Sequence, residues 1–231
     1  MAIIFFDDNA HQTLLPLTYT RPVANLRIGI LTIAEKWGKY LNADFSYHTQ
    51  DYLQAKFPLT VVSENIFVNG SVCPDDSLVE AIDKLKTGEA LKSNDILIAV
   101  KLNKTDAADF NHNRGFESVV DYGRSFVAIR YPEDIFKQNA VELNKDFALL
   151  TKGRVSAPVS NTNTIIGEGQ FFAEEGAVAE CSTFNTTNGP IYLGANSEVW
   201  EGVHIRGAFA LCNDSQVKMG AKIYGATTIG P

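Results

Sequence analysis

Cysteine is scarce in this chain, which has three among 231 residues: Cys73, Cys181 and Cys212. None of them forms a CxxC pair, so neither a structural zinc site nor a disulfide framework is indicated. We therefore expect three reduced, buried thiols in a cytoplasmic protein. Positive charge is also in short supply, because the formal net charge is −7. Non-specific nucleic-acid binding needs a basic face, so the composition argues against a nucleic-acid partner.

Long apolar runs are missing as well. The run that opens the chain, Met1–Phe6, is too short for a signal peptide and has no basic residue before it. No window approaches the ~20 apolar residues of a membrane span, so we expect no membrane partner. The hydrophobic fraction of 45% is ordinary for a globular protein, and the length fits one large domain or two modest ones.

An aliphatic residue recurs at every sixth position near the end of the chain. The register is Leu193, Val199, Ile205, Leu211, Val217, Ile223 and Ile229. A helix repeats at 3.6 residues and a strand at 2, so neither explains a period of six. Six residues fit one side of a triangular coil, and three such hexads make a coil that stacks at the ~4.8 Å strand spacing. The pattern predicts a left-handed parallel β-helix with these residues inside.

A weaker register precedes this one and consists of Ile166, Phe172, Val178 and Phe184. The polar segment 185–190 interrupts it and predicts a corner loop. We expect the solenoid to begin near Asn163. Because a solenoid needs a cap at each end and the repeat runs to the last residues, we expect the natural protein to be longer.

The N-terminal part alternates between strand and helix patterns. Strands are predicted at 3–6, 45–48, 65–68, 96–101 and 126–130, and helices at 30–41, 74–86 and 132–150. Asp75 or Asp76 is the candidate N-cap of the second helix. The alternation predicts an α/β domain over residues 1–155, with a mostly parallel sheet and helices on both faces, before a β-helix over 160–231. Ligands of such sheets bind beyond the C-terminal strand ends, which points to the loops after Phe6 and Val68.

The segment Leu14–Pro22, which reads LLPLTYTRP, resembles the N-terminal element of sugar-1-phosphate nucleotidyltransferases. With the hexapeptide repeats, the architecture resembles the bifunctional N-acetylglucosamine-1-phosphate uridylyltransferase/acetyltransferase. The segments Asn188–Gly194 and Met219–Ala226 resemble a divergent branch of this group. The resemblance implies a Rossmann-type nucleotidyltransferase fold followed by the β-helix.

The family's catalytic loop is largely absent from this sequence. The resemblance places Asn9 and His11 where two loop glycines are expected, Thr13 where an arginine is expected and Val23 where a lysine is expected. Ser71 stands where the family has the aspartate that holds Mg²⁺. Transfer at phosphorus depends on positioning and charge neutralisation, so these departures indicate a degenerate nucleotidyltransferase.

Polar residues around the same loops are the candidate site. Asp8 and Arg21 are the catalytic candidates, and Asp8 is the candidate ligand for Mg²⁺. The candidate substrate-binding residues are Asp7, Asn9, His11, Arg27, Asn69 and Gly70. Alternatives stay open: the aspartates could cap a turn, the arginines could form surface ion pairs and His11 could be solvated. Lys36 and Lys39 are expected on the wet face of the first helix.

His204 is the only histidine of the predicted solenoid and precedes the inward Ile205, so it should point outward. The resemblance implies an outward histidine as general base in acyl transfer from acyl-CoA, with Glu201, Arg206 and Asn213 as neighbours. A merely exposed histidine is the alternative.

We therefore expect a transferase that acts on a nucleotide-sugar or an amino-sugar phosphate. Its N-terminal domain would be a degenerate nucleotidyltransferase, its C-terminal part a hexapeptide acyltransferase, and the resemblance implies a homotrimer through the β-helix. Two alternatives remain. One is an active sugar-1-phosphate pyrophosphorylase, and the other is a non-catalytic trimeric scaffold or regulatory subunit.

Overall fold

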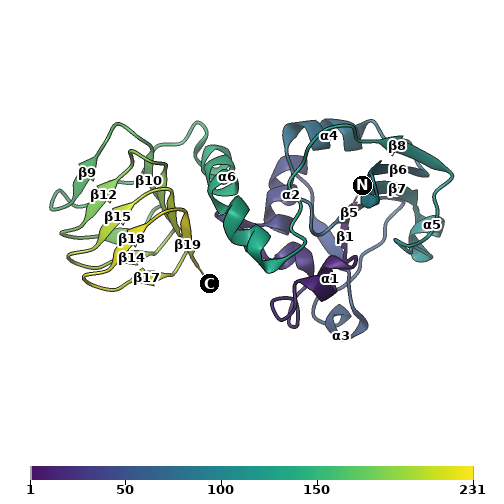
Figure 1. Ribbon diagram of the computed structural model, residues 1–231, viewed down its shortest axis with the longest axis horizontal. Helices are drawn as coiled ribbons and strands as arrows, with labels where there is room; N and C mark the ends of the chain where they lie inside the picture. Colours follow the sequence, from purple (N-terminus) through teal and green to yellow (C-terminus); the bar gives the residue numbers. More distant parts are fainter. Residues whose placement is uncertain (1, 231) are drawn as a thin grey trace. The chain divides into compact units, whose positions relative to one another are not determined.

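The computed structural model describes residues 2–230 (Figure 1). The chain divides into two compact units. The first unit runs to Arg27 and resumes over Leu31–Asp134, and the second combines Ile28–Ile30 with the chain from Ile135 onward. Most of helix α6 (Pro132–Thr151) belongs to the second unit by its contacts, whereas the sequence grouped residues up to 155 with the first domain.

A six-stranded sheet forms the centre of the first unit, in the order β4-β1-β5-β7-β6-β8. β7 runs antiparallel to its neighbours β5 and β6, and the other pairings are parallel. A mixed α/β unit with parallel strands is therefore confirmed. The bounds are β1 (Ala2–Phe6), β4 (Phe45–His48), β5 (Glu64–Asn69), β6 (Glu89–Ser93), β7 (Ile96–Asn103) and β8 (Ser118–Asp121).

The predicted strand at 126–130 is wrong. That segment forms one isolated bridge, between Val72 and Ala128, while the sequence analysis missed β6 and β8. All four residues of β8 are exposed, so this edge strand carries no inward-outward alternation that a pattern search could detect.

Three of the described helices of the first unit begin at side-chain caps. Thr32 and Glu35 form a capping box at the start of α2, and Asp75 Oδ1, one of the two candidate caps, accepts the Leu78 N–H at the start of α4. The bounds are α1 (Ala10–Thr13), η1 (Val23–Asn25), α2 (Ile33–Leu41), α3 (Asp51–Gln54), α4 (Asp76–Asp83) and α5 (Lys104–Ala108), with the short strands β2 (Arg27–Ile28) and β3 (Leu31–Thr32) before α2.

Side-chain alternation along β1 divides the core into two faces. Ile4 and Phe6 pack with Phe67 and with Ala107 of α5 on one face, while Ile3 and Phe5 are buried on the other. Lys36 of α2 was expected to be solvated, but it is 1% exposed. It follows Ile33 by three positions and so shares the buried side of the helix.

The second unit contains three stacks of short parallel strands, and successive strands of a stack come from successive coils (Figure 1). This arrangement fits a three-sided parallel β-helix. The first stack is β9 (Thr164–Ile166), β12 (Thr183–Asn185), β15 (His204–Arg206) and β18 (Lys222–Tyr224); the second is β10 (Phe171–Ala173), β13 (Ile191–Leu193), β16 (Phe209–Leu211) and β19 (Thr227–Ile229); the third is β11 (Val178–Ala179), β14 (Glu198–Val199) and β17 (Gln216–Val217).

The hexad register from Leu193 onward is confirmed. Leu193 pairs with Leu211 and Leu211 with Ile229, so three hexads make one coil. The interior is built from the predicted residues: Leu193, Val199, Ile205, Leu211 and Val217 are buried, and Ile223 and Ile229 pack against them.

The earlier register is wrong except at Phe184. Val178 and Ile166 are 53% and 44% exposed, and Phe172 points away from the solenoid interior. The inward residues are instead Ala173 and Ala179, which pair with Leu193 and Val199. The corner at Cys181 has a φ of 47°, and the step from Ala179 to Phe184 is one residue shorter than a hexad. Cys181 is exposed at this corner, so only Cys73 and Cys212 fulfil the expectation of buried thiols.

Helix α6 covers the outer face of the second stack. Its Leu143 and Phe147 pack with Phe172, Tyr192 and other outward residues of that stack. The segment Ile28–Ile30 lies against the same helix: Asp146 Oδ2 accepts the Ile30 N–H at 2.8 Å. A Cβ at Gly29, whose φ is 73°, would come within 2.5 Å of Asp146, so only glycine fits this approach. Within residues 2–230 no helix is both long enough and apolar enough to cross a bilayer.

Candidate functional site

Three parallel strands of the first unit bring their C-terminal ends to one edge of the sheet. Phe6 of β1 pairs with His48 of β4 on one side and with Asn69 of β5 on the other. The polar residues that follow these strands therefore meet at this edge. They include Asp7 and Asp8, and we call the group formed by Asp7, Asp8, His11, Thr49, Asn69 and Arg130 the strand-end network.

Asp7 is 6% exposed, and both of its carboxylate oxygens are engaged. Oδ1 accepts the Val23 N–H at 2.9 Å, and Oδ2 accepts the Thr49 hydroxyl at 2.5 Å. His11 Nδ1 lies 3.2 Å from Oδ2 but outside hydrogen-bond geometry, while its Nε2 is 3.2 Å from the Tyr52 hydroxyl. Asp7 thus ties the loop after β1 to the start of η1 and to the end of β4.

Asp8 is held by three donors. Oδ1 accepts the Ala10 N–H at 2.8 Å, and Oδ2 accepts from Asn69 Nδ2 at 3.0 Å and from Arg130 at 3.2 Å. Arg130 itself is fixed through its backbone, because its N–H donates to Asp134 Oδ2 and its carbonyl accepts the Thr13 hydroxyl. The Asp8 carboxylate is therefore neutralised by a positioned guanidinium.

Asn69, at the end of β5, connects the network to β7. Besides Asp8, its Nδ2 donates to the Leu97 carbonyl at 3.0 Å, and its Oδ1 accepts both the backbone N–H and the hydroxyl of Ser71. Gly70 N–H donates to the Phe6 carbonyl, and a Cβ there would lie 3.0 Å from Ala24 N. Ser71 is fully buried, and its hydroxyl donates a hydrogen bond to Asn69 Oδ1.

These residues do not fit a divalent cation. Within residues 2–230, no group of three or more His, Cys, Asp or Glu side chains is placed to hold a metal ion. Hard cations such as Mg²⁺ need several oxygen ligands, and here Asp8 offers oxygens that three donors already occupy. Mg²⁺ at Asp8 is a prediction that this set of occupied oxygens does not support.

The other candidates of the first unit lie apart from these contacts. Asn9 is exposed, and its side chain does not cap α1. Arg21 is exposed, and in the described part of the chain its side chain makes no hydrogen bond or ion pair. Arg27 Nη1 lies 3.9 Å from Glu35 Oε2 at the start of α2.

Two histidines that the sequence analysis left without a role lie near the same strand ends. His48 ends β4, and its ring packs against Phe110 at 5.4 Å; the ring of His112 stacks on Phe6 at 5.9 Å. Burial lowers the pKa of His48, and the neighbouring His112 lowers it further. Arg130 was also missed, since no spacing joins it to a residue 122 positions away.

His204 is exposed on β15 of the second unit and pairs in register with Thr183 and Lys222. It lines an open cavity of about 610 Å³ together with Arg206, Lys222 and Tyr224. Glu201 lies in the turn before β15. Asn213 lies at another corner of the coil, where its Oδ1 accepts the Ala195 N–H.

A family model described as sugar nucleotidyl transferase matches residues 3–155, and the chain therefore belongs to this family. Small-molecule sugar phosphates and nucleotides are accordingly the substrate class of the matched domain. The comparison with curated proteins gave no match.

Proposed function

We propose that the N-terminal domain binds a nucleotide-sugar or a sugar phosphate beyond the C-terminal strand ends without catalysing nucleotidyl transfer. The observation that carries the proposal is the pairing of Asp8 with Arg130 and Asn69. Family membership supports the substrate class. The location agrees with the general position of ligands in sheets of this kind.

The distribution of charge supports the proposed absence of catalysis. Transfer at phosphorus needs groups that neutralise the charge developing on the phosphate oxygens. In the loop after β1, Thr13 uses its hydroxyl on the Arg130 carbonyl and Val23 carries no charge. Arg21 is exposed and uncommitted, so it can pair with a phosphate group of the bound ligand.

The test measures binding and turnover on the same protein. Nucleoside triphosphates, Mg²⁺ and a panel of sugar 1-phosphates are supplied while pyrophosphate is followed, and nucleotide-sugars are titrated by calorimetry. We expect saturable binding without pyrophosphate release. Arg21→Gln should weaken binding about tenfold or more, because a charge-assisted hydrogen bond is lost, whereas Arg124→Gln, which removes an exposed arginine that bonds Ser77, should not.

Each opposite outcome has a definite meaning. Mg²⁺-dependent pyrophosphate release would overturn the proposal in favour of an active pyrophosphorylase. Absence of binding by every nucleotide-sugar and sugar phosphate would favour the scaffold or regulatory alternative.

The cavity beside His204 supports a second candidate function, acyl transfer in the β-helix. Its lining combines an exposed imidazole, the cations Arg206 and Lys222, and the apolar Ile166 and Ile223. There the amine of an amino sugar would attack the thioester carbonyl of acyl-CoA, His204 would take the amine proton, and the CoA thiol would leave. Release of CoA thiol that depends on an amino sugar and is lost in His204→Asn would support it; release unaffected by that change would not.

The homotrimer is part of the same proposal. Exposed apolar side chains on the β-helix, among them Ile165, Ile166 and Tyr224, are candidates for its interface. Light scattering on the purified chain should give three times the monomer mass of 25.3 kDa, and a monomer would contradict it.

A further inference from the structure

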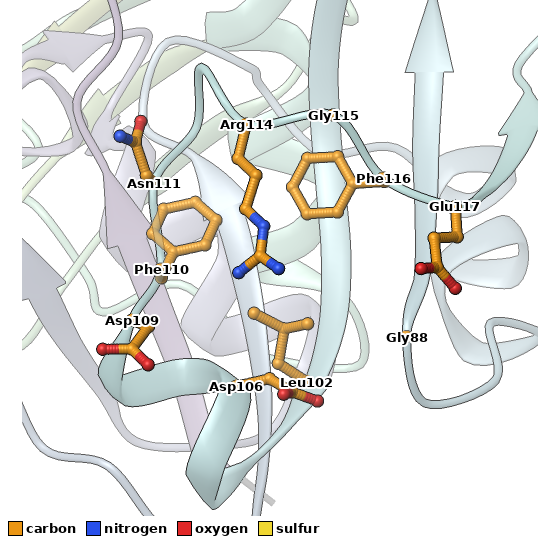
Figure 2. Close-up of a pocket in the computed structure, with 10 residues that line it drawn as sticks. All are labelled: Gly88, Leu102, Asp106, Asp109, Phe110, Asn111, Arg114, Gly115, Phe116 and Glu117. Atoms are coloured by element: carbon orange, nitrogen blue, oxygen red, sulfur yellow. The ribbon is translucent and has the colours of Figure 1, made fainter.

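A pocket of the first unit lies at the opposite edge of the sheet from the strand-end network. Leu102, near the end of β7, pairs with Asn65 near the beginning of β5, whereas Asn69, which bonds Asp8, is the last residue of β5. Gly88 and Glu117, just before β6 and β8, complete this edge. The pocket has a volume of about 250 Å³ (Figure 2).

The loop that forms the pocket is anchored in the core. The Phe110 ring stacks on Phe67 with centroids 4.0 Å apart and packs against Phe6 at 5.2 Å, so it is only 8% exposed. The next residues close a turn, in which Asn111 accepts the N–H groups of Asn113 and Arg114. Core packing of Phe110 and the turn at Asn111 therefore fix the loop in place beside the pocket.

Donors and acceptors stand side by side in this pocket. Figure 2 shows the Arg114 guanidinium extending between the rings of Phe110 and Phe116, with Asp106, Asp109 and Glu117 around the rim. Within residues 2–230 the side chains of Arg114, Asp109 and Glu117 form no hydrogen bond or ion pair. Their hydrogen-bonding capacity is thus available to a ligand.

We propose that this pocket binds a small, uncharged sugar of a single ring. Each sugar hydroxyl both donates and accepts, which matches carboxylates beside a guanidinium. The partly exposed ring of Phe116 suits the C–H face of a pyranose ring, with the buried Phe110 as the apolar base, and a few placed polar groups around apolar walls are typical of small-molecule sites. This site is independent of the nucleotide-sugar site proposed above.

Size and charge narrow the ligand class. The volume is below the ~300–1,000 Å³ that drug-sized ligands occupy, so a nucleotide does not fit. Three carboxylates against one guanidinium repel a phosphate, so phosphorylated sugars are disfavoured. An uncharged monosaccharide meets both conditions.

The test is a titration of the whole chain with glucose, galactose, mannose and N-acetylglucosamine, followed by amide chemical shifts. We expect saturable shifts at Gly88 and Gly115, which line the pocket, and none at Gly70 in the strand-end region. Arg114→Gln should weaken binding about tenfold or more, because charge-assisted hydrogen bonds to the sugar are lost. Phe116→Ala should weaken it as well, and Arg124→Gln, outside the pocket, should leave it unchanged.

The exposure of Arg114 allows its replacement without unfolding, which the amide spectrum itself verifies. The proposal is overturned if none of the four sugars shifts the Gly88 and Gly115 amides. It is also overturned if Arg114→Gln leaves the affinity unchanged, or if glucose 1-phosphate binds this pocket more tightly than glucose.

Discussion

The interior of the β-helix and the strand-end network of the first unit are built in opposite ways. In the β-helix, apolar residues of one coil lie on equivalent residues of the next, as Leu193, Leu211 and Ile229 do. In the network, buried polar groups satisfy one another across long stretches of chain: Asp8 bonds Asn69 and Arg130, 61 and 122 positions away. Burial in the first case removes apolar surface from water, and in the second it demands a partner for every polar atom.

This difference leads to different responses to substitution. A truncated core residue of the β-helix leaves a cavity, so its cost grows with the volume removed. A truncated member of the network leaves a buried partner unsatisfied, so its cost depends on the hydrogen bond and not on volume. Each substitution below is therefore paired with the same substitution at an exposed position, so that the cost of the buried site can be measured separately.

The largest effect is expected for Phe184→Ala in the β-helix. Phe184 is fully buried and packs against the Phe171 ring at 5.1 Å. Its loss should lower the free energy of unfolding by about 3–5 kcal/mol. Urea unfolding followed by far-UV circular dichroism measures this. Phe136→Ala is the matched control, because Phe136 is 71% exposed and its loss should change stability by less than about 0.5 kcal/mol. Equal effects of the two variants would show that Phe184 is not a core residue.

Val199→Ala should come next, at about 2 kcal/mol, since it deletes two methyl groups from a 2% exposed side chain. Its control, Val178→Ala, tests the corrected register directly. Val178 would lie in the interior like Val199 if the earlier register of Ile166, Phe172, Val178 and Phe184 were correct, but it is 53% exposed. We expect Val178→Ala to cost less than about 0.5 kcal/mol in the same urea experiment. A cost near that of Val199→Ala would restore the original register.

The same contrast explains what could be predicted from the sequence. The hexad register after Leu193 predicted the buried residues of three sides, because residues that stack in space are equally spaced in sequence. The first coil escaped prediction, since the corner at Cys181 shortens one step and shifts the inward positions to Ala173 and Ala179. Alanine carries too little hydrophobic signal to reveal such a shift.

In the first unit, strand ends were predictable but the partners of the side chains were not. The ends of β1 and β5 correctly indicated where Asp7, Asp8 and Asn69 would gather, since parallel strands share an edge. Arg130 was beyond prediction, because its segment has the apolar pattern of a strand yet pairs only through the bridge between Val72 and Ala128. Its approach to Asp8 depends on the tertiary fold alone.

A smaller effect is expected for Thr49→Val in the strand-end network. The change keeps the side-chain shape but removes the hydroxyl that donates to Asp7 Oδ2, leaving a buried carboxylate oxygen without that donor. We expect a loss of about 1 kcal/mol. Fluorescence of the buried Trp37, measured in a Trp200→Phe background, follows the first unit specifically, because the chain has two tryptophans.

Thr60→Val provides the control for that measurement, as Thr60 is exposed and its replacement should be nearly neutral. If Thr49→Val were equally neutral, the network would not depend on the hydroxyl, and Asp7 would be satisfied by the Val23 N–H alone.

The smallest effect is a pH dependence from His48. Burial and the nearby His112 leave the pKa of His48 below its ordinary value, although a backbone hydrogen bond, Asp7 and Asp51 act in the opposite direction. In the unfolded chain His48 therefore binds a proton as the pH falls through ~6.5, whereas in the folded protein it remains neutral to lower pH. The free energy of unfolding consequently falls as the pH drops through that range. His48→Gln should flatten the change in urea midpoint between about pH 7.5 and about pH 5.5. His204→Gln, at an exposed position of the second unit, controls for the loss of a histidine as such. A steeper slope in His48→Gln would mean that the carboxylates, and not burial, dominate the environment of His48, and the strand-end region would then favour a cation.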